Sequence, residues 1–129
     1  MPLTVEVVTP EREVTVADDA TFVLAHGTEG DVGILPGIAP MLIALGVGPM
    51  KIERGEQDQS ILVDGGFLQV KDDRVIVLAE YAVLPEEANA QAVSERIEEL
   101  KRKLQADMEN EQAKRELARQ EALHRMLRI

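Results

Sequence analysis

Residues 74–104 read RVIVLAEYAVLPEEANAQAVSERIEELKRKL, and the spacing of their apolar side chains changes at Pro85. Before this proline, residues 74–79 form a β-branched run that is typical of a strand. After it, apolar residues recur at intervals of three and four, as along one side of a helix; this stripe comprises Val93, Ile97, Leu100, Leu104 and Met108. The stretch therefore predicts a β part in residues 1–84 and a helical part in residues 85–129.

The β part consists of short apolar runs separated by turn signals. Every glycine lies between Gly27 and Gly66, and residues 54–56 and 71–74 are polar enough to form hairpin tips. The pair Gly65-Gly66 allows a bend or bulge that a Cβ would obstruct. Such spacing favours a compact antiparallel sandwich or barrel. The expected strands are residues 3–8, 13–16, 21–25, 41–45, 50–53, 60–64, 67–70 and 74–79.

The helical part has two apolar faces with a weak turn signal between them. The second face lies in residues 113–127, and Asp107 or Asn110 could cap a new helix at its start. If the turn forms, the tail is an antiparallel hairpin of two helices. If it does not, residues 85–129 form one helix that is roughly 65 to 70 Å long.

Composition excludes several classes of function. The 129 residues suffice for one domain of ordinary size, contain no cysteine, and have a net charge of −10 with 2% aromatic residues. This composition excludes a disulfide framework and disfavours nucleic-acid binding. We expect no signal peptide. Residues 32–50 contain no charged residue, as a membrane-spanning helix would, but their three prolines and four glycines disfavour such a helix.

Motifs for catalysis or metal binding are also missing. His26 and His124 have no partner at metal-ligand spacing, and neither a nucleophile elbow nor a phosphate-binding glycine loop occurs. We therefore expect no catalytic, metal or cofactor site. His26 stands beside Gly27 at a strand end, where a structural role is expected.

Charge divides with the predicted fold. Residues 1–93 contain 5 basic and 16 acidic residues, whereas residues 112–129 contain 5 basic and 2 acidic residues. A basic amphipathic helix suits an acidic protein surface. The alternative is a solvated face with ordinary pairs, such as Glu121 with Arg125.

The segment of residues 29–40 combines turn residues with apolar ones. Its glycines and prolines predict two tight turns around a short strand. Ile34, Leu35 and Ile38 stand among these turn residues and could form a small apolar patch for a partner.

Four blocks of sequence resemble the epsilon subunit of bacterial F-type ATP synthases, which is called delta in mitochondria. The blocks are VTPE at residues 8–11, GDVGILPGIAPM at 30–41, GGFLQV at 65–70 and VIVLAE at 75–80, followed by the helical tail. The resemblance implies a ten-stranded sandwich with a helical hairpin. It also implies a non-catalytic subunit of the rotary central stalk, peripheral to the cytoplasmic side of the bacterial cell membrane.

The resemblance also implies partners. The sandwich would contact the gamma subunit and the membrane ring of c subunits, with Glu29, Asp31 and Ile38 at the ring. Many members have histidine where Ile38 stands, and the isoleucine makes this contact more apolar.

The tail would either fold beside the sandwich or extend along gamma into the catalytic head and block ATP hydrolysis. In the extended form its basic residues would contact the catalytic beta subunits; these residues are Lys114, Arg115, Arg119 and Arg125. The compact and extended conformations can form a switch only if their free energies differ by no more than a few kcal/mol.

Some members bind ATP at the foot of the hairpin through an aspartate and an arginine. Asn89 and Ala92 replace these two residues here. Without the arginine there is no fork for a phosphate, so we expect ATP binding to be weak or absent.

The competing hypothesis is a free-standing β-sandwich that binds a small ligand and dimerises through its helices. A small hydrolase with paired carboxylates would require a cleft that the sequence does not indicate.

Overall fold

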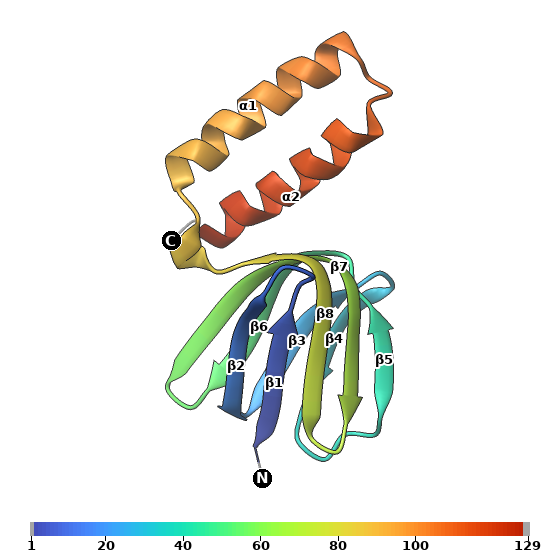
Figure 1. Cartoon of the computed structure of the whole chain (residues 1–129), viewed down its shortest axis with the longest axis vertical. Helices are drawn as coiled ribbons and strands as arrows, with labels where there is room; N and C mark the ends of the chain where they lie inside the picture. The colour runs from blue at the N-terminus through green and yellow to red at the C-terminus, as the bar shows by residue number, and fades with distance from the viewer. Residues whose placement is uncertain (1, 128–129) are drawn as a thin grey trace.

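The computed structural model describes residues 2–127, in which a β-sandwich carries two helices at one end (Figure 1). Two residues of the predicted tail, Arg128 and Ile129, lie outside the described residues. The strands are β1 (Leu3–Val8), β2 (Glu13–Ala20), β3 (Phe22–Gly27), β4 (Gly30–Ile34), β5 (Met41–Ala44), β6 (Val47–Arg54), β7 (Gln57–Lys71) and β8 (Arg74–Val83). They are followed by the short 3-10 helix η1 (Pro85–Glu87) and by helices α1 (Ala90–Ala106) and α2 (Glu111–Leu127).

The strands pair in the order β2-β1-β8-β7-β6-β3-β4, and β5 pairs with β7. All pairs are antiparallel except β1 with β8. Leu3, Val5 and Val7 alternate with half-buried residues along β1, and this period of two directs one face of each strand into a common core. The antiparallel sandwich predicted from the sequence is therefore confirmed.

The strand count differs from the ten that the resemblance implied, because residues 2–127 form eight strands. The two runs expected at residues 60–64 and 67–70 are one strand, β7, of 15 residues. Gly65 and Gly66 adopt φ angles of 77° and 102°, so the strand bends without ending. The first half of β7 pairs with β6 and the second half with β5.

The helical part is a hairpin of two helices, so the single long helix left open by the sequence does not occur in this state (Figure 1). Asn110 caps α2, since its Oδ1 accepts a hydrogen bond from the amide of Ala113 at 3.0 Å. Arg96 of α1 donates two hydrogen bonds, of 2.6 and 2.7 Å, to the carboxylate of Glu116 on α2. No helix within residues 2–127 has the length and apolar character needed to cross a membrane.

A second apolar cluster joins the hairpin to the sandwich. Leu62 of β7 is fully buried against Val93 and Ile97 of α1 and Leu123 of α2, whereas its neighbours Ile61 and Val63 belong to the sandwich core. Leu62 therefore faces outward from the sandwich and is covered by the helices, of which α2 is the nearer (Figure 1).

Candidate partner-binding surfaces

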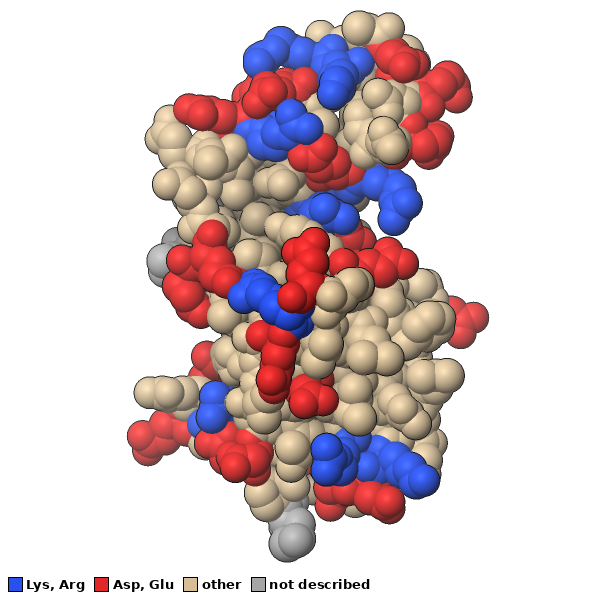
Figure 2. Space-filling model, in the orientation of Figure 1, with Lys and Arg blue, Asp and Glu red and all other residues tan. Residues whose placement is uncertain are grey.

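An exposed apolar surface lies on three neighbouring strands. Leu42 of β5, Phe67 of β7 and Leu78 of β8 are 70%, 53% and 58% exposed. Phe67 stands directly opposite Leu78 on one side and Ala44 on the other. We call Leu42, Phe67 and Leu78 the docking face; Figure 2 shows an uncharged surface over β5, β7 and β8.

A hollow of about 410 Å³ extends the docking face toward β1. It is lined by Val8, Pro10, Phe67 and Leu78 among others. Neighbouring large apolar side chains on a solvent-facing sheet are typical of a surface that a partner covers. Sequence reasoning did not single out these residues. The available signal was the unbroken apolar run at residues 75–79, because a strand with a solvated face would alternate.

The apolar patch expected in residues 29–40 does not form. Ile34 is fully buried and Ile38 is packed against the sandwich core, while Leu35 is 57% exposed. Ile34 ends β4 with its side chain on the core side of the sheet, so a segment rich in turns still contributes to the interior.

The β3–β4 hairpin brings together two of the three residues expected at the c-ring. Glu29 occupies its turn, and Asp31 is the second residue of β4. Ile38 follows the opposite end of β4, in a loop where the amide of Gly37 donates to a carboxylate oxygen of Asp73 at 2.7 Å. Glu29 and Asp31 thus belong to one end of β4 and Ile38 to the other.

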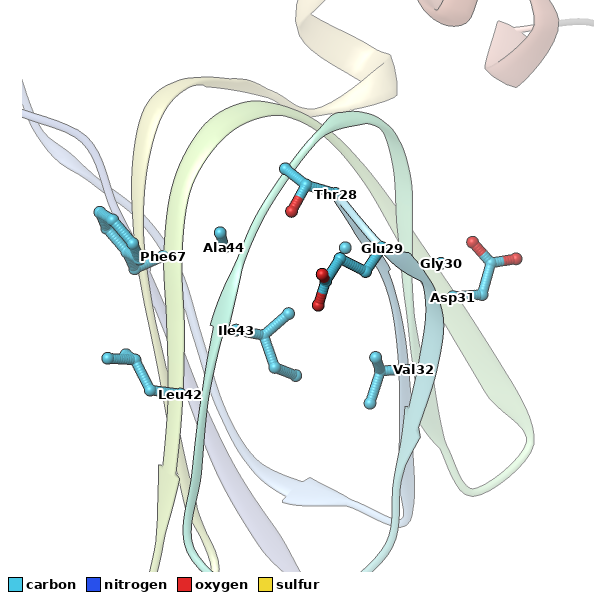
Figure 3. Close-up of a pocket in the computed structure, with 10 residues that line it drawn as sticks. Thr28, Glu29, Gly30, Asp31, Val32, Leu42, Ile43, Ala44 and Phe67 are labelled. Atoms are coloured by element: carbon cyan, nitrogen blue, oxygen red, sulfur yellow. The ribbon is translucent and has the colours of Figure 1, made fainter.

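Glu29 and Asp31 differ in what they contact. The Glu29 side chain stands over a hollow of about 470 Å³ that is lined by Val32, Ile43 and Phe67 among others (Figure 3). Asp31 points away from this hollow (Figure 3), and its Oδ1 lies 2.6 Å from His26 Nδ1. The hollow shares Leu42 and Phe67 with the docking face, so the two surfaces are continuous.

His26 lies near the end of β3, where a structural role is expected, and its ring makes two close contacts. Its ring lies so close to Gly48 that a Cβ built there would come 2.5 Å from the ring Cδ2. The same ring contacts Asp31 across the β3–β4 pair. Within the described residues no group of three or more histidine or acidic side chains could hold a metal ion.

The four basic residues expected at the catalytic head have different environments on α2. Arg119 Nε donates to Asp64 Oδ2 at 2.7 Å. Arg115 lies 3.8 Å from Glu80 in an exposed pair, and Lys114 pairs at 3.3 Å with Glu111 on its own helix. Arg125 is exposed in the last turn of α2.

The foot of the hairpin is organised by two local contacts. Asn89 caps α1, because its Oδ1 accepts a hydrogen bond from the amide of Ala92 at 3.0 Å. Arg12 bonds to Glu87 of η1 at 2.8 Å, and this hydrogen bond is the main reason that the pKa of Glu87 is lowered. The segment between the sandwich and α1 is therefore anchored up to Glu87.

Comparisons with known proteins agree with this architecture. A family model described as "ATP synthase, Delta/Epsilon chain, beta-sandwich domain" matches residues 2–85. The ATP synthase epsilon chain of Pelotomaculum thermopropionicum is 42% identical over 97 residues, covering 73% of this chain and 72% of the relative. That of Desulforudis audaxviator is 45% identical over 97 residues, covering 73% of this chain and 70% of the relative.

Likeness in structure extends over the helices. A chain in the structure of Euglena gracilis mitochondrial ATP synthase, OSCP/F1/c-ring, superposes with a TM-score of 0.82 and 22% identity. The match covers 98% of this chain and 82% of that chain, and at this identity it demonstrates a shared fold. The sequence relatives support the epsilon-subunit interpretation and not the free-standing ligand-binding sandwich.

Proposed function

Because the chain belongs to the ATP synthase delta/epsilon family, we propose that it is a central-stalk subunit with no active site of its own. In this role it couples ion flow through the membrane c-ring to ATP synthesis in the catalytic head. The observation that carries the proposal is the docking face, which leaves Leu42, Phe67 and Leu78 exposed on an otherwise acidic sandwich. An exposed apolar patch of this kind marks a surface that binds a partner.

Gamma is the partner that we assign to the docking face. The hollow beside Phe67 and Leu78 offers space for apolar side chains of a partner, and interfaces of this kind have an apolar centre with a polar rim. Lys71, Asp72, Asp73 and Arg74 form the tip of the β7–β8 hairpin, two strands of the docking face. These four residues would form part of the polar rim.

The c-ring contact is assigned to the β3–β4 hairpin, with Glu29 as its principal carboxylate. Asp31 is already paired with His26, whereas Glu29 stands over an open hollow with apolar walls. Ile38 would take part only from the loop after β4, where its side chain packs on the core. Continuity between this hollow and the docking face would let the sandwich contact gamma and the ring together, on the cytoplasmic side of the membrane.

The helical tail is assigned an inhibitory role in ATP hydrolysis. Lys114 and Arg125 do not contact the sandwich through any ion pair within residues 2–127, and Arg115 does so only in an exposed pair. Contact of α2 with the catalytic beta subunits would require the hairpin to leave the sandwich, since Arg119 is bound there in the compact state.

ATP binding by the isolated chain is expected to be weak or absent. Asn89 uses its Oδ1 to cap α1, and Ala92 provides no cation for a phosphate. A calorimetric titration that detected micromolar binding of ATP would overturn this part of the proposal.

The inhibitory role is tested by ATP hydrolysis with the matching epsilon-free catalytic head. The full chain should bind and inhibit, and a chain ending at Leu84 should bind without inhibiting. Inhibition by both forms would remove the role from the tail. Binding by neither would contradict the stalk assignment.

The docking face is tested by a matched pair of substitutions. Leu78→Asp places a charge in the docking face, whereas Leu35→Asp places one at a leucine of nearly the same exposure outside it, 57% against 58%. We expect Leu78→Asp to abolish binding to the head and Leu35→Asp to retain it. Equal binding of the two variants would refute the assignment of this face.

A further inference from the structure

Arg119 is held by two residues that face each other across β7 and β8. Its Nε donates to Asp64 Oδ2 at 2.7 Å, and its Cζ lies 4.1 Å from the centroid of the Tyr81 ring. Asp64 and Tyr81 are directly opposite in the strand register. One guanidinium therefore makes a charge-assisted hydrogen bond and a cation–π contact at the same point of the sandwich.

This site is more enclosed than the other ion pair between α2 and the sandwich. The side chains of Asp64 and Arg119 are 16% and 29% exposed, whereas those of Glu80 and Arg115 are 65% and 72% exposed. Because water screens the exposed Arg115–Glu80 pair, this pair contributes little to the stability of hairpin docking. A short pair with restricted access to water is strengthened by the lower local dielectric.

The bend in β7 positions the carboxylate. Asp64 immediately precedes Gly65 and Gly66, where β7 turns, and the amide of Gly65 donates to the carbonyl of Gly46. A Cβ on Gly65 would come 2.6 Å from Glu80 Oε2, so glycine leaves room for Glu80 beside the site. The sandwich thus presents Asp64 from a defined backbone beneath α2.

We propose that Asp64 and Tyr81 form a latch on Arg119, which determines how often the helical hairpin leaves the sandwich. The regulatory consequence rests on the proposed function, in which Arg119 also contacts the catalytic head. While Asp64 and Tyr81 hold the Arg119 guanidinium against the sandwich, it is not available to the catalytic head. The sandwich therefore competes with the head for Arg119, and weakening the latch favours the inhibitory state.

The latch is tested in the full chain by Asp64→Asn, with Glu80→Gln as the matched control. Each substitution removes one negative charge that faces α2, but only Asp64 belongs to the latch. We expect hydrogen exchange of the α2 amides to accelerate about tenfold in Asp64→Asn, while exchange in the sandwich core is unchanged. Glu80→Gln should change the α2 rates by less than about twofold.

Equal acceleration in both variants would overturn the latch, because general charge attraction would then hold the hairpin. No acceleration in Asp64→Asn would also overturn it. Arg119→Gln removes the same contact from the helix side and should reproduce the acceleration, which checks the result if Asp64→Asn perturbs β7. Tyr81→Leu should accelerate exchange to a smaller extent.

Hydrolysis by the matching catalytic head separates the latch from the proposed function. Asp64→Asn should inhibit at about tenfold lower concentration than the unaltered chain, whereas Arg119→Gln should inhibit less strongly than Asp64→Asn, because it also loses the head contact. If exchange in α2 accelerates but inhibition is unchanged, the latch on the hairpin is supported and its competition with the head for Arg119 is refuted. The inhibitory role of the tail is decided separately by the chain ending at Leu84.

Discussion

Replacement of Leu62 by alanine is expected to loosen the helical hairpin without unfolding the sandwich. Leu62 is fully buried, yet it points away from the sandwich core and is covered by α1 and α2. Loss of its side chain therefore acts on the contact between the two parts. The adjacent Ile61, also fully buried, points the other way into the sandwich core and provides a matched control.

The magnitude follows from the burial of Leu62. Truncation of a fully buried leucine to alanine destabilises a protein by about 2–5 kcal/mol, the larger values arising where the surroundings cannot close the cavity. The contacts here come from a hairpin that can shift toward the sheet, so the lower part of the range applies. We expect the free energy of hairpin docking to fall by about 2–3 kcal/mol, which corresponds to roughly 30- to 150-fold more frequent opening.

Hydrogen exchange resolved along the chain measures this opening directly. Leu62→Ala should accelerate exchange in α1 and α2 and leave the slowest amides of the sandwich unchanged. Ile61→Ala should accelerate exchange in the sandwich strands as well. If Leu62→Ala accelerates exchange in the sandwich as much as in the helices, the two parts unfold as one unit and the reasoning fails.

Two further predictions concern the bend in β7 and the pairing of the helices. Gly66→Ala should lower the free energy of unfolding by roughly 2–4 kcal/mol in denaturant, because Gly66 has a φ of +102° and a Cβ there would collide with the carbonyl of Leu78. Gly55 also has a positive φ but is surrounded by open space, so Gly55→Ala should lower the free energy of unfolding by only about 1 kcal/mol. Similar losses in the two variants would contradict the steric argument. Arg96 donates two hydrogen bonds to Glu116 and lowers the pKa of this carboxyl from its ordinary value of 4.5. The stability that the Arg96–Glu116 pair gives to the hairpin is therefore complete above pH 4.5. It is lost as the pH falls through the lowered pKa of Glu116, where the carboxylate becomes protonated. Hydrogen exchange of the helix amides, corrected for the intrinsic exchange rates, should accelerate between pH 6 and pH 3 as this stability is lost. In Glu116→Gln the acceleration over the same pH range should be smaller.

Several features of the fold follow from residues that are close in sequence. The apolar stripe from Val93 to Met108 predicts α1, and Asn110 stands where a side-chain cap for a second helix is expected. The sequence nevertheless allows either a turn between the helices or one continuous helix. The sequence signal for ending α1 is weak, and the packing of α2 against β6 and β7 favours the compact hairpin.

Other features depend on contacts between distant residues. Two strands were expected at residues 60–64 and 67–70, whereas Gly65 and Gly66 bend a single strand whose neighbours supply its partners. The patch expected at Ile34 and Ile38 fails for a similar reason, because the packing of β4 directs Ile34 into the core. Turn residues indicate where a segment bends, but the packing of distant strands decides which of its side chains enter the core.

The family, the change from strands to helices at Pro85 and the basic character of α2 follow from the amino-acid sequence alone, because each depends on residue types and their spacing along the chain. The exposed face shared by Phe67 and Leu78 and the ion pair of Arg119 with Asp64 depend instead on the three-dimensional fold. Asp64 and Arg119 are 55 positions apart, and the docking of α2 on the sandwich brings them together. The register of β7 with β8 places Phe67 opposite Leu78. The physical reason is that helix and strand periods are local properties of the backbone, whereas a surface or an ion pair is defined by which segments pack together.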